Sequence, residues 1–205
     1  MKRLPLDFSR FRATRSQQNE LPLRIKPDLR QAQLSGVPLS TAVVYFSCKQ
    51  VIDLEAFRPH VLIGLFEDLE RIADQVALGI ADLSSVDHAI LALTGCGEAP
   101  LGDKLRVVLW QTFGVPVFEI LVAPDGAVLA ADCEAHDGWH LQRNARATTF
   151  DGELLILQKA RHVIRTGLSG QIETGLCPCG RATPRLNSVQ MCSHPDTLTA
   201  LAATA

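Results

Sequence analysis

Apolar residues in the middle of the chain form short continuous runs, separated by stretches in which they recur at helical spacing. The continuous runs are 41–46 (TAVVYF), 61–65 (VLIGL), 89–93 (AILAL) and 115–122 (VPVFEILV). Runs of this length and β-branched content are typical of buried strands. Over 66–77 the apolar residues instead recur every three or four positions, with charged residues between them, which predicts an amphipathic helix.

A second helix is predicted after the third strand, opened by Pro100 at a first-turn position. Strands that alternate with helices indicate a parallel sheet with right-handed crossovers. We therefore predict an α/β fold, with a parallel-sheet lobe and flanking helices over 41–123. The apolar face of the second helix is made by Leu101, Leu105, Val108, Leu109 and Phe113.

The helical period stops after about residue 124, where turn residues separate short apolar runs. This pattern predicts a small antiparallel module over 124–186. Its turns are expected at Pro124-Asp125-Gly126, Asp137-Gly138 and Asp151-Gly152, and its strands at Ala127–Ala131, Trp139–Gln142, Glu153–Leu157 and His162–Arg165.

The two ends of the chain lack a sustained apolar period. Residues 1–40 contain several prolines, and eight lysines and arginines fall within 1–30, so we predict an extended basic arm. The arm is either a solvated tail or a docking segment for an acidic partner or a phosphate-bearing ligand. Residues 187–205 are predicted to form a tail.

Composition narrows the class of protein. The chain has 205 residues, 47% of them hydrophobic, and a net charge of −2, which suits one domain and requires neither a nucleic-acid nor a membrane partner. No apolar run is long enough to span a membrane, and the N-terminus lacks the apolar core of a secretory signal. We therefore expect a cytoplasmic protein, in which six cysteines indicate metal binding or reactivity more often than disulfides.

Two local groups of cysteine and histidine have the spacing of a structural zinc site. Cys177 and Cys179 flank a proline and precede a glycine, which stiffens the turn and lets backbone amides approach the sulfurs. Cys133 and His140 lie seven positions apart across a predicted turn, so a hairpin can return the imidazole beside the thiol. Zinc prefers such thiolate and imidazole ligands in a closed tetrahedron. We predict that these four residues bind one structural zinc ion.

Other interpretations of these residues stay open. Cys133 can be an ordinary core residue and His140 a surface histidine, and the two cysteines of the Cys-x-Cys pair can form a redox dithiol. His136 can replace His140 as a ligand. Cys192 and His194 offer another Cys/His pair, whereas Cys48 and Cys96 are predicted to be core residues.

Several segments resemble the phenylacetate–coenzyme A ligases. Residues 133–140 (CEAHDGWH), 165–167 (RTG) and 177–185 (CPCGRATPR) are similar to that family's CE…DGLH, YRTGD and CPCGR…R segments. Upstream, Gly97-Glu98-Ala99-Pro100 resembles the GAEP turn that lies against the adenine of ATP, and 113–117 (FGVPV) resembles the strand before the YGxTE motif. The resemblance covers about residues 40–186.

This resemblance implies an adenylate-forming enzyme that makes acyl-coenzyme A thioesters through an acyl-adenylate. It also implies a zinc ion held by a cysteine, a histidine and a Cys-x-Cys pair, the same four residues chosen above. Gly97, Glu98, Ala99 and Pro100 would be a remnant of the adenine-side turn. ATP, AMP and coenzyme A are thus candidate ligands whose binding the sequence leaves open.

The chain departs from the family at positions that matter for catalysis. No Ser/Thr/Gly-rich phosphate loop precedes the matched region, and the family's C-terminal domain with its adenylation lysine has no counterpart. The YGxTE position holds 120–125 (ILVAPD), without the threonine. At the TGD position the chain has Thr166-Gly167-Leu168, and leucine cannot accept a hydrogen bond from ribose. We expect no adenylation by this chain alone.

Three function hypotheses follow. The first is a zinc-binding, non-catalytic ligase homologue that acts as a binding or partner module. The second is one subunit of a split acyl-coenzyme A ligase, completed by a second ligase-like chain. The third is a different enzyme that uses Glu98, His88 or His162 near the former nucleotide cleft. We also expect an open sheet edge, for which a homodimer would provide a cover.

Overall fold

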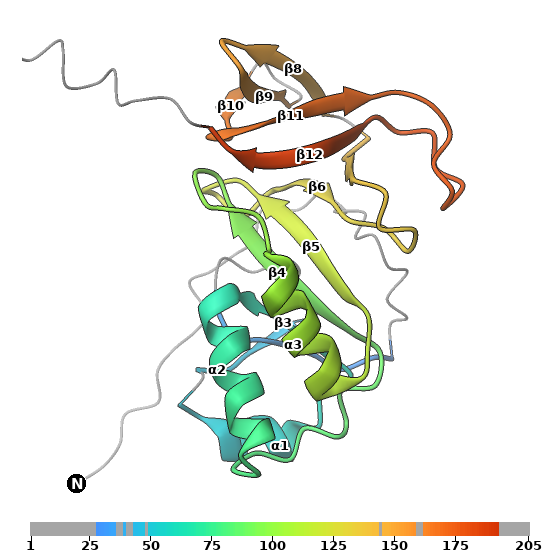
Figure 1. The fold of residues 1–205 in the computed structure, drawn as a ribbon. Helices are drawn as coiled ribbons and strands as arrows, with labels where there is room; N and C mark the ends of the chain where they lie inside the picture. The colour runs from blue at the N-terminus through green and yellow to red at the C-terminus, as the bar shows by residue number, and fades with distance from the viewer. Residues whose placement is uncertain are drawn as a thin grey trace, which may run out of the picture.

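The computed structural model describes residues 28–35, 39, 43–47, 49–143, 145–158 and 162–192. These residues form a nine-stranded sheet, a three-stranded sheet and three helices (Figure 1). Most of the expected basic arm lies outside the described residues, as do Cys48, His194 and the end of the expected tail.

The centre of the large sheet is the predicted α/β lobe. Strands β3 (Val61–Leu65), β4 (Ala89–Gly95) and β5 (Val117–Val122) lie side by side and run parallel. Helices α2 (Phe66–Ala77) and α3 (Asp103–Phe113) pack together on one face of these strands (Figure 1). Buried side chains lie on both faces of the strands, as in parallel sheets covered on both sides. The α/β class is therefore confirmed.

Helix α3 begins later than predicted. Its N-cap is Gly102, so Pro100 lies before the helix and not in its first turn. The backbone N–H of Leu101 donates to the Glu119 carboxylate at 2.7 Å, which fixes the chain just ahead of the helix. The longest described helix has 12 residues, and none in the described part of the chain is long and apolar enough to cross a bilayer.

The prediction of an extended arm over residues 1–40 is wrong in part, because some of these residues form the far edge of the lobe. Residues assigned to that arm form strand β1 (Gln31–Gln33), which pairs in parallel with β3 on one side and with β2 (Val43–Tyr45) on the other. A three-residue Gln-Ala-Gln strand is too short to show a period of two. The fold accommodates Gln33, which is fully buried, because its side-chain oxygen accepts the N–H of Leu39. Helix α1 (Val51–Phe57) was also not predicted.

The antiparallel strands extend the same sheet and do not form a separate module. Strands β6 (Val128–Ala131) and β7 (Trp139–Leu141) continue from β5, followed by β12 (Arg185–Met191) and β11 (Leu168–Glu173). The predicted boundary falls between β5 and β6, where the pairing changes from parallel to antiparallel, but it does not separate two sheets, because β6 pairs with the edge of β5. The predicted tail boundary at 187 is wrong, since it divides strand β12.

Three short strands make the second sheet. Strands β8 (Arg146–Phe150), β9 (Glu153–Leu157) and β10 (Val163–Arg165) pair antiparallel in the order β10-β9-β8. Leu154 and Ile156 of β9 are fully buried and pack in one core cluster with Leu168 of β11. This small sheet thus closes the apolar core under the antiparallel end of the large sheet. Among the described strands, β2 and β11 are the edges of the large sheet; a homodimer at an open edge stays a prediction.

The turn at Gly138 generates a first prediction, because it lies directly against β12. Gly138 has φ +81°, and an added Cβ would meet the Asn187 side chain at 1.7 Å and the Leu186 carbonyl oxygen at 2.9 Å. Gly138→Ala should lower the free energy of unfolding by roughly 2–4 kcal/mol in total. Roughly 1–2 kcal/mol of this is the cost of an alanine in the left-handed conformation, and the rest comes from the overlap of its Cβ with β12. Chemical denaturation measures the loss.

Gly152→Ala is the matched control for this prediction. Gly152 has φ +80°, but nothing lies within 4 Å of an added Cβ. In this variant the free energy of unfolding should fall only by the cost of the left-handed alanine, about 1–2 kcal/mol. Equal losses in the two variants would contradict a close approach of the turn to β12.

Candidate metal centre

Three neighbouring strands and one loop bring the predicted ligands together. Cys133 follows β6 by two residues, and His140 is the central residue of β7. Cys177 and Cys179 lie in the loop between β11 and β12. Since β7 pairs with β6 on one side and with β12 on the other, it holds the hairpin ligands beside the Cys-x-Cys turn.

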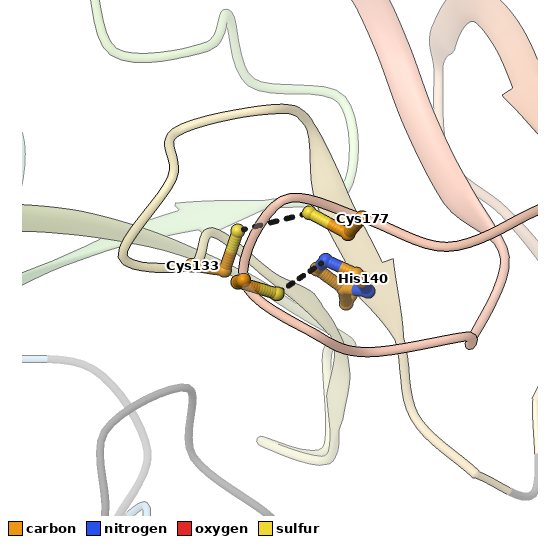
Figure 2. Close-up of side chains that lie close together, drawn as sticks. Cys133, His140 and Cys177 are labelled. Atoms are coloured by element: carbon orange, nitrogen blue, oxygen red, sulfur yellow. Dashed lines mark hydrogen bonds between the residues drawn. The ribbon is translucent and has the colours of Figure 1, made fainter.

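The side chains of Cys133, His140 and Cys177 point toward one another (Figure 2), and Cys179 belongs to the same cluster. One ligand atom from each of Cys133, His140, Cys177 and Cys179 lies within 4.8 Å of all the others. The sulfurs of Cys133 and Cys177 are 3.8 Å apart, and the Cys179 sulfur is 3.5 Å from Nε2 of His140. A tetrahedral zinc ion with bonds of about 2.3 Å to sulfur and about 2.05 Å to nitrogen would place such pairs about 3.8 and 3.5 Å apart. The donor set and its spacing therefore fit zinc.

The same distances argue against a disulfide. The sulfurs of Cys133 and Cys177 are much farther apart than the roughly 2.05 Å of a disulfide bond, and every described cysteine is a free thiol. In the Cys-x-Cys pair both Cys177 and Cys179 are free thiols, and Cys177 is almost fully buried, which does not suit a redox dithiol.

Backbone amides point at the cysteine sulfurs. Cys133 accepts the N–H groups of Ala135 and Asp137, and Cys177 accepts the N–H of Cys179. Burial raises the pKa of Cys133 to about 11, although the two amides act to lower it. Amide hydrogen bonds of this kind stabilise thiolates at metal sites. The loops are therefore shaped to receive negative charge on sulfur that burial alone would oppose.

His140 is oriented for coordination by its second nitrogen. Its Nδ1 lies 2.8 Å from the Thr183 hydroxyl oxygen, so a hydrogen bond donated there leaves the Nε2 lone pair directed at the cysteines. Burial, followed by the charges of Arg181 and Arg185, lowers the pKa of His140. Both effects favour the neutral imidazole, the form that binds metals.

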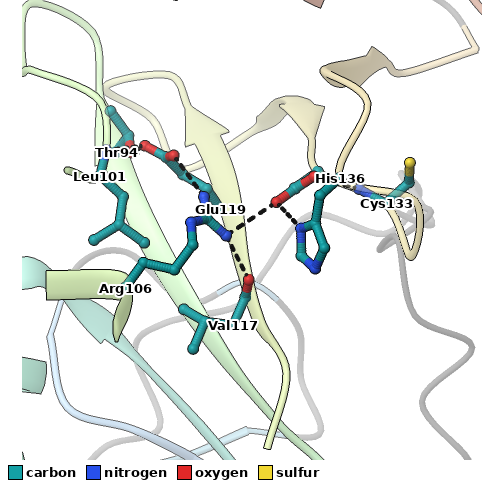
Figure 3. Close-up of polar contacts among 8 residues, drawn as sticks. Thr94, Leu101, Arg106, Val117, Glu119, Cys133 and His136 are labelled. Carbon is teal, nitrogen blue, oxygen red and sulfur yellow. Dashed lines mark hydrogen bonds and ion pairs between the residues drawn. The ribbon is translucent and has the colours of Figure 1, made fainter. Parts of the chain in front are cut away.

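A buried polar network ties this loop to the lobe (Figure 3). Arg106 of α3 forms ion pairs with Asp132 at 3.2 Å and with Glu119 of β5 at 3.5 Å. Asp132 in turn accepts the backbone N–H of Cys133 at 2.8 Å and pairs with Nδ1 of His136 at 2.8 Å. The conformation of the Cys133 loop therefore depends on a helix of the other half of the sheet. The sequence analysis missed this network, whose members are too far apart in the chain to form a motif.

The alternative ligands lie elsewhere. The His136 ring bonds Asp132 and stacks on Phe118 with ring centroids 5.4 Å apart, so it is not in the cluster. The Cys192 sulfur lies 3.9 Å from the Gly152 carbonyl oxygen, also outside the cluster. Cys96 is half-buried at the border of the antiparallel core, close to its predicted core position.

Comparison with known proteins identifies the fold. No protein-family model matches the chain, and no curated protein matches it. Solved structures do match: 2-hydroxyisobutyryl-CoA ligase, in complex with 2-HIB-AMP and CoA, has a TM-score of 0.63 and 14% identity over 79% of this chain. The anthranilate CoA ligase AuaEII, in complex with anthranoyl-AMP, has a TM-score of 0.53 and 10% identity over 78% of the chain. The described chain has an adenylate-forming ligase fold.

The match covers only part of these ligases. The chain spans 44% of the 2-hydroxyisobutyryl-CoA ligase and 39% of AuaEII. The amide bond synthetase McbA from Marinactinospora thermotolerans matches with a TM-score of 0.50 and 16% identity, over 77% of this chain and 40% of its own. At these identities the likeness establishes the ligase fold, as the motifs predicted, and not an activity.

The turn that resembles the adenine-side motif contacts the 165–168 segment of the ligase fold. The N–H of Gly97 donates to the Thr166 carbonyl oxygen at 2.7 Å, and a Cβ on Gly167 would lie 2.9 Å from Gly97 Cα. The Glu98 carboxylate folds back onto the Gly95 N–H at 2.7 Å and so closes its own turn. Nucleotide binding by Gly97, Glu98, Ala99 and Pro100 stays a prediction.

The resemblance to the ligases places Leu168 where that family has a ribose-binding aspartate. Its side chain is fully buried and packs in the antiparallel core with Leu154 and Ile156. An alkyl group accepts no hydrogen bond. Because the Leu168 side chain is buried in the core, it is also not available to contact a ligand. This residue therefore serves packing.

The residues of the third hypothesis do not share a site. His88 precedes β4 and Glu98 follows it, so the seven-residue strand separates them by more than about 20 Å at about 3.3 Å per residue. His162 is exposed just before β10. His88 and Glu98 therefore lie far apart, and a catalytic role for Glu98, His88 or His162 by itself stays a prediction.

Glu119 generates a prediction about pH. It is 2% exposed, and burial raises its pKa above the ordinary 4.5, although hydrogen bonds from Thr94 and Leu101 and the charge of Arg106 act to lower it. Between pH 4.5 and the raised pKa, Glu119 holds more protons in the folded state than in the unfolded state. The free energy of unfolding therefore falls as pH rises through this range, by at most about 1.4 kcal/mol per pH unit.

Glu119→Gln removes this titration. The free energy of unfolding of the variant, minus that of the wild type, should therefore increase as pH rises from about 4.5, the ordinary glutamate pKa, and level off above the raised pKa of Glu119. Urea denaturation at several pH values measures the difference. A difference that is constant with pH, or that falls, would show that burial does not control this carboxyl group.

Proposed function

We propose that this protein is a zinc-binding, non-catalytic homologue of the adenylate-forming ligases that acts as a binding or partner module. The observation that carries the proposal is the convergence of the ligand atoms of Cys133, His140, Cys177 and Cys179 within 4.8 Å of one another. Their measured separations suit a tetrahedral zinc ion, and a neutral imidazole with three thiols is a common donor set for structural zinc.

The proposed ion has a structural role. Four protein ligands complete the tetrahedron, so no position is open for water or substrate. Cys133, His140 and Cys177 are each no more than 3% exposed, so solvent has little access to the ion. The ligands come from both sides of β7, and their coordination would hold the β11–β12 loop onto the β6–β7 hairpin. Binding free energy at such a site is folding free energy.

We propose that the chain is non-catalytic because of the residues it has at three positions of the ligase motifs. Leu168 is buried where the resembling enzymes hold ribose, and Glu98 is engaged by its own turn. The segment 120–125 supplies strand and turn residues in place of the family's Tyr-Gly-x-Thr-Glu. Adenylyl transfer depends on positioned charges and hydrogen bonds around the phosphates and ribose. A binding role is compatible with all three differences, whereas adenylation is not.

The second candidate is a subunit of a split acyl-coenzyme A ligase. The observation that favours it is coverage, because the chain corresponds to 44% of 2-hydroxyisobutyryl-CoA ligase. A second chain would then supply the phosphate loop, the ribose contact and the adenylation lysine. The buried Leu168 argues against this candidate, because the second chain would have to supply the ribose contact that the resembling ligases make from this position.

Metal analysis tests the zinc. Purified protein should contain one zinc per chain, held by the four clustered ligands. Cys177→Ser and Cys179→Ser should lose the metal and lower the melting temperature, because each removes a thiolate from a closed site. Cys96→Ser is the matched control, since Cys96 is half-buried outside the cluster, and it should keep the metal. A metal-free wild type that melts like a zinc-loaded sample would refute the proposal.

A nucleotide assay tests the lack of catalysis and separates the two candidates. With ATP, an aryl acid and coenzyme A, the zinc-loaded chain should release neither AMP nor pyrophosphate. Calorimetry with ATP, AMP and coenzyme A then reports whether any ligand site remains. Turnover by the chain alone would refute the non-catalytic proposal. Turnover that appears only when a co-purifying second chain is added would support the split ligase.

A further inference from the structure

The buried guanidinium of Arg185 lies beside the metal cluster and has no role in the proposed function so far. Arg185 is the first residue of β12 and is 8% exposed. It is the direct cross-strand partner of His140 in β7. Directly paired residues of antiparallel strands project from the same face of the sheet. Strand pairing therefore places an arginine next to a proposed metal ligand.

One side of the guanidinium is paired with carboxylates. Nη2 of Arg185 donates to Glu173 at 2.9 Å, and Nη1 lies 3.1 Å from Asp137 in an ion pair. Both carboxylates are about two-fifths exposed, at 42% and 41%. Because solvent screens such pairs, they compensate only part of the cost of burying the cation.

The other side of the guanidinium faces sulfur. Within the described part of the chain, Nε and Nη1 of Arg185 are buried and make no hydrogen bond of normal geometry to any acceptor, and Nη1 has only its ion pair with Asp137. The guanidinium contacts the thiol of Cys177. Buried donors without an oxygen or nitrogen partner are costly, so a thiolate at this point would satisfy them.

The contact between Arg185 and Cys177 would balance charge at the proposed metal site. Three thiolates and a neutral imidazole around Zn²⁺ carry a net charge of about −1. Most of that charge would be buried, since Cys133 and Cys177 are no more than 2% exposed. An isolated buried charge is strongly unfavourable unless a counter-charge accompanies it. Arg185 is a buried cation in contact with one of the three sulfurs.

We infer that Arg185 is a positioning residue of the metal centre, which donates hydrogen bonds to the Cys177 thiolate and balances the negative charge of a zinc-bound Cys₃His cluster. The inference rests on the proposed zinc site and deepens it. It assigns a role to Arg185 beyond its ion pairs with Asp137 and Glu173, which leave the buried Nε without a partner among the described residues.

Three variants test this role in the full chain. Arg185→Met removes both charge and donors at similar side-chain length. Arg185→Lys keeps the charge but not the planar fork of donors. Arg181→Met is the matched control, because Arg181 also acts on His140 by its charge but forms an ion pair with Glu134 at 3.7 Å. Each protein is measured for zinc affinity by chelator competition and, after loading with Co²⁺, for its sulfur-to-cobalt charge-transfer absorption.

Arg185→Met should weaken zinc binding about tenfold or more, as loss of other partners of metal ligands does. Its charge-transfer band should move to longer wavelength, because a thiolate without a hydrogen bond gives up electron density more easily. Arg185→Lys should show an intermediate loss of affinity and the same direction of band shift. Arg181→Met should stay within about twofold of the wild type, with an unchanged band, if its charge acts only at long range.

Each outcome decides the inference. An unchanged band and affinity in Arg185→Met would overturn it. An equal effect of Arg181→Met would also overturn it, since general charge and not a bond to sulfur would be responsible. If Arg185→Met does not fold, Arg185→Lys decides by the presence or absence of the band shift. A wild type that binds no metal would refute the proposed function itself, whereas a metal-binding wild type with unaffected Arg185 variants would refute only this inference.

Discussion

The pairing of β7 with β6 on one side and β12 on the other is the interaction on which the rest of the structure depends. It joins β11 and β12 to the rest of the large sheet and places His140 between Cys133 and the Cys-x-Cys loop. Each of these ladders is short, with two residue pairs in register. A metal ion coordinated from both sides of β7 would reinforce the point where backbone hydrogen bonds are fewest.

Charge links this point to the rest of the protein in two directions. Toward the lobe, Arg106 bridges Glu119 and Asp132, and Asp132 holds the backbone of Cys133. Toward the edge of the sheet, Arg185 joins the Cys177 sulfur to the carboxylates of β11 and the Gly138 turn. Each arginine is thus shared between a strand or helix and a loop of the proposed metal site. Such sharing makes the conformation of the loops part of the fold.

The positions at which the resemblance places ligand-binding polar groups serve the fold in this chain. Leu168 shows this most clearly, because β11 there supplies a buried side chain to the core. Glu98 satisfies the backbone of its own turn. A fold can keep its architecture after losing such groups because its stability comes mainly from apolar burial and backbone pairing, whereas ligand binding depends on a few polar atoms.

The sequence by itself determined the α/β class, both main helices, the central strands and the four clustered ligands, because each has a local signal: apolar periodicity, or cysteine and histidine at short spacing. It did not reveal β1, whose three residues carry no period, or the place of the antiparallel strands in the large sheet, because strand order depends on which edges meet in space. Only the tertiary structure decided that His140 and not His136 faces the cysteines, and that Arg106 and Arg185 flank them, since those contacts join residues far apart in the chain.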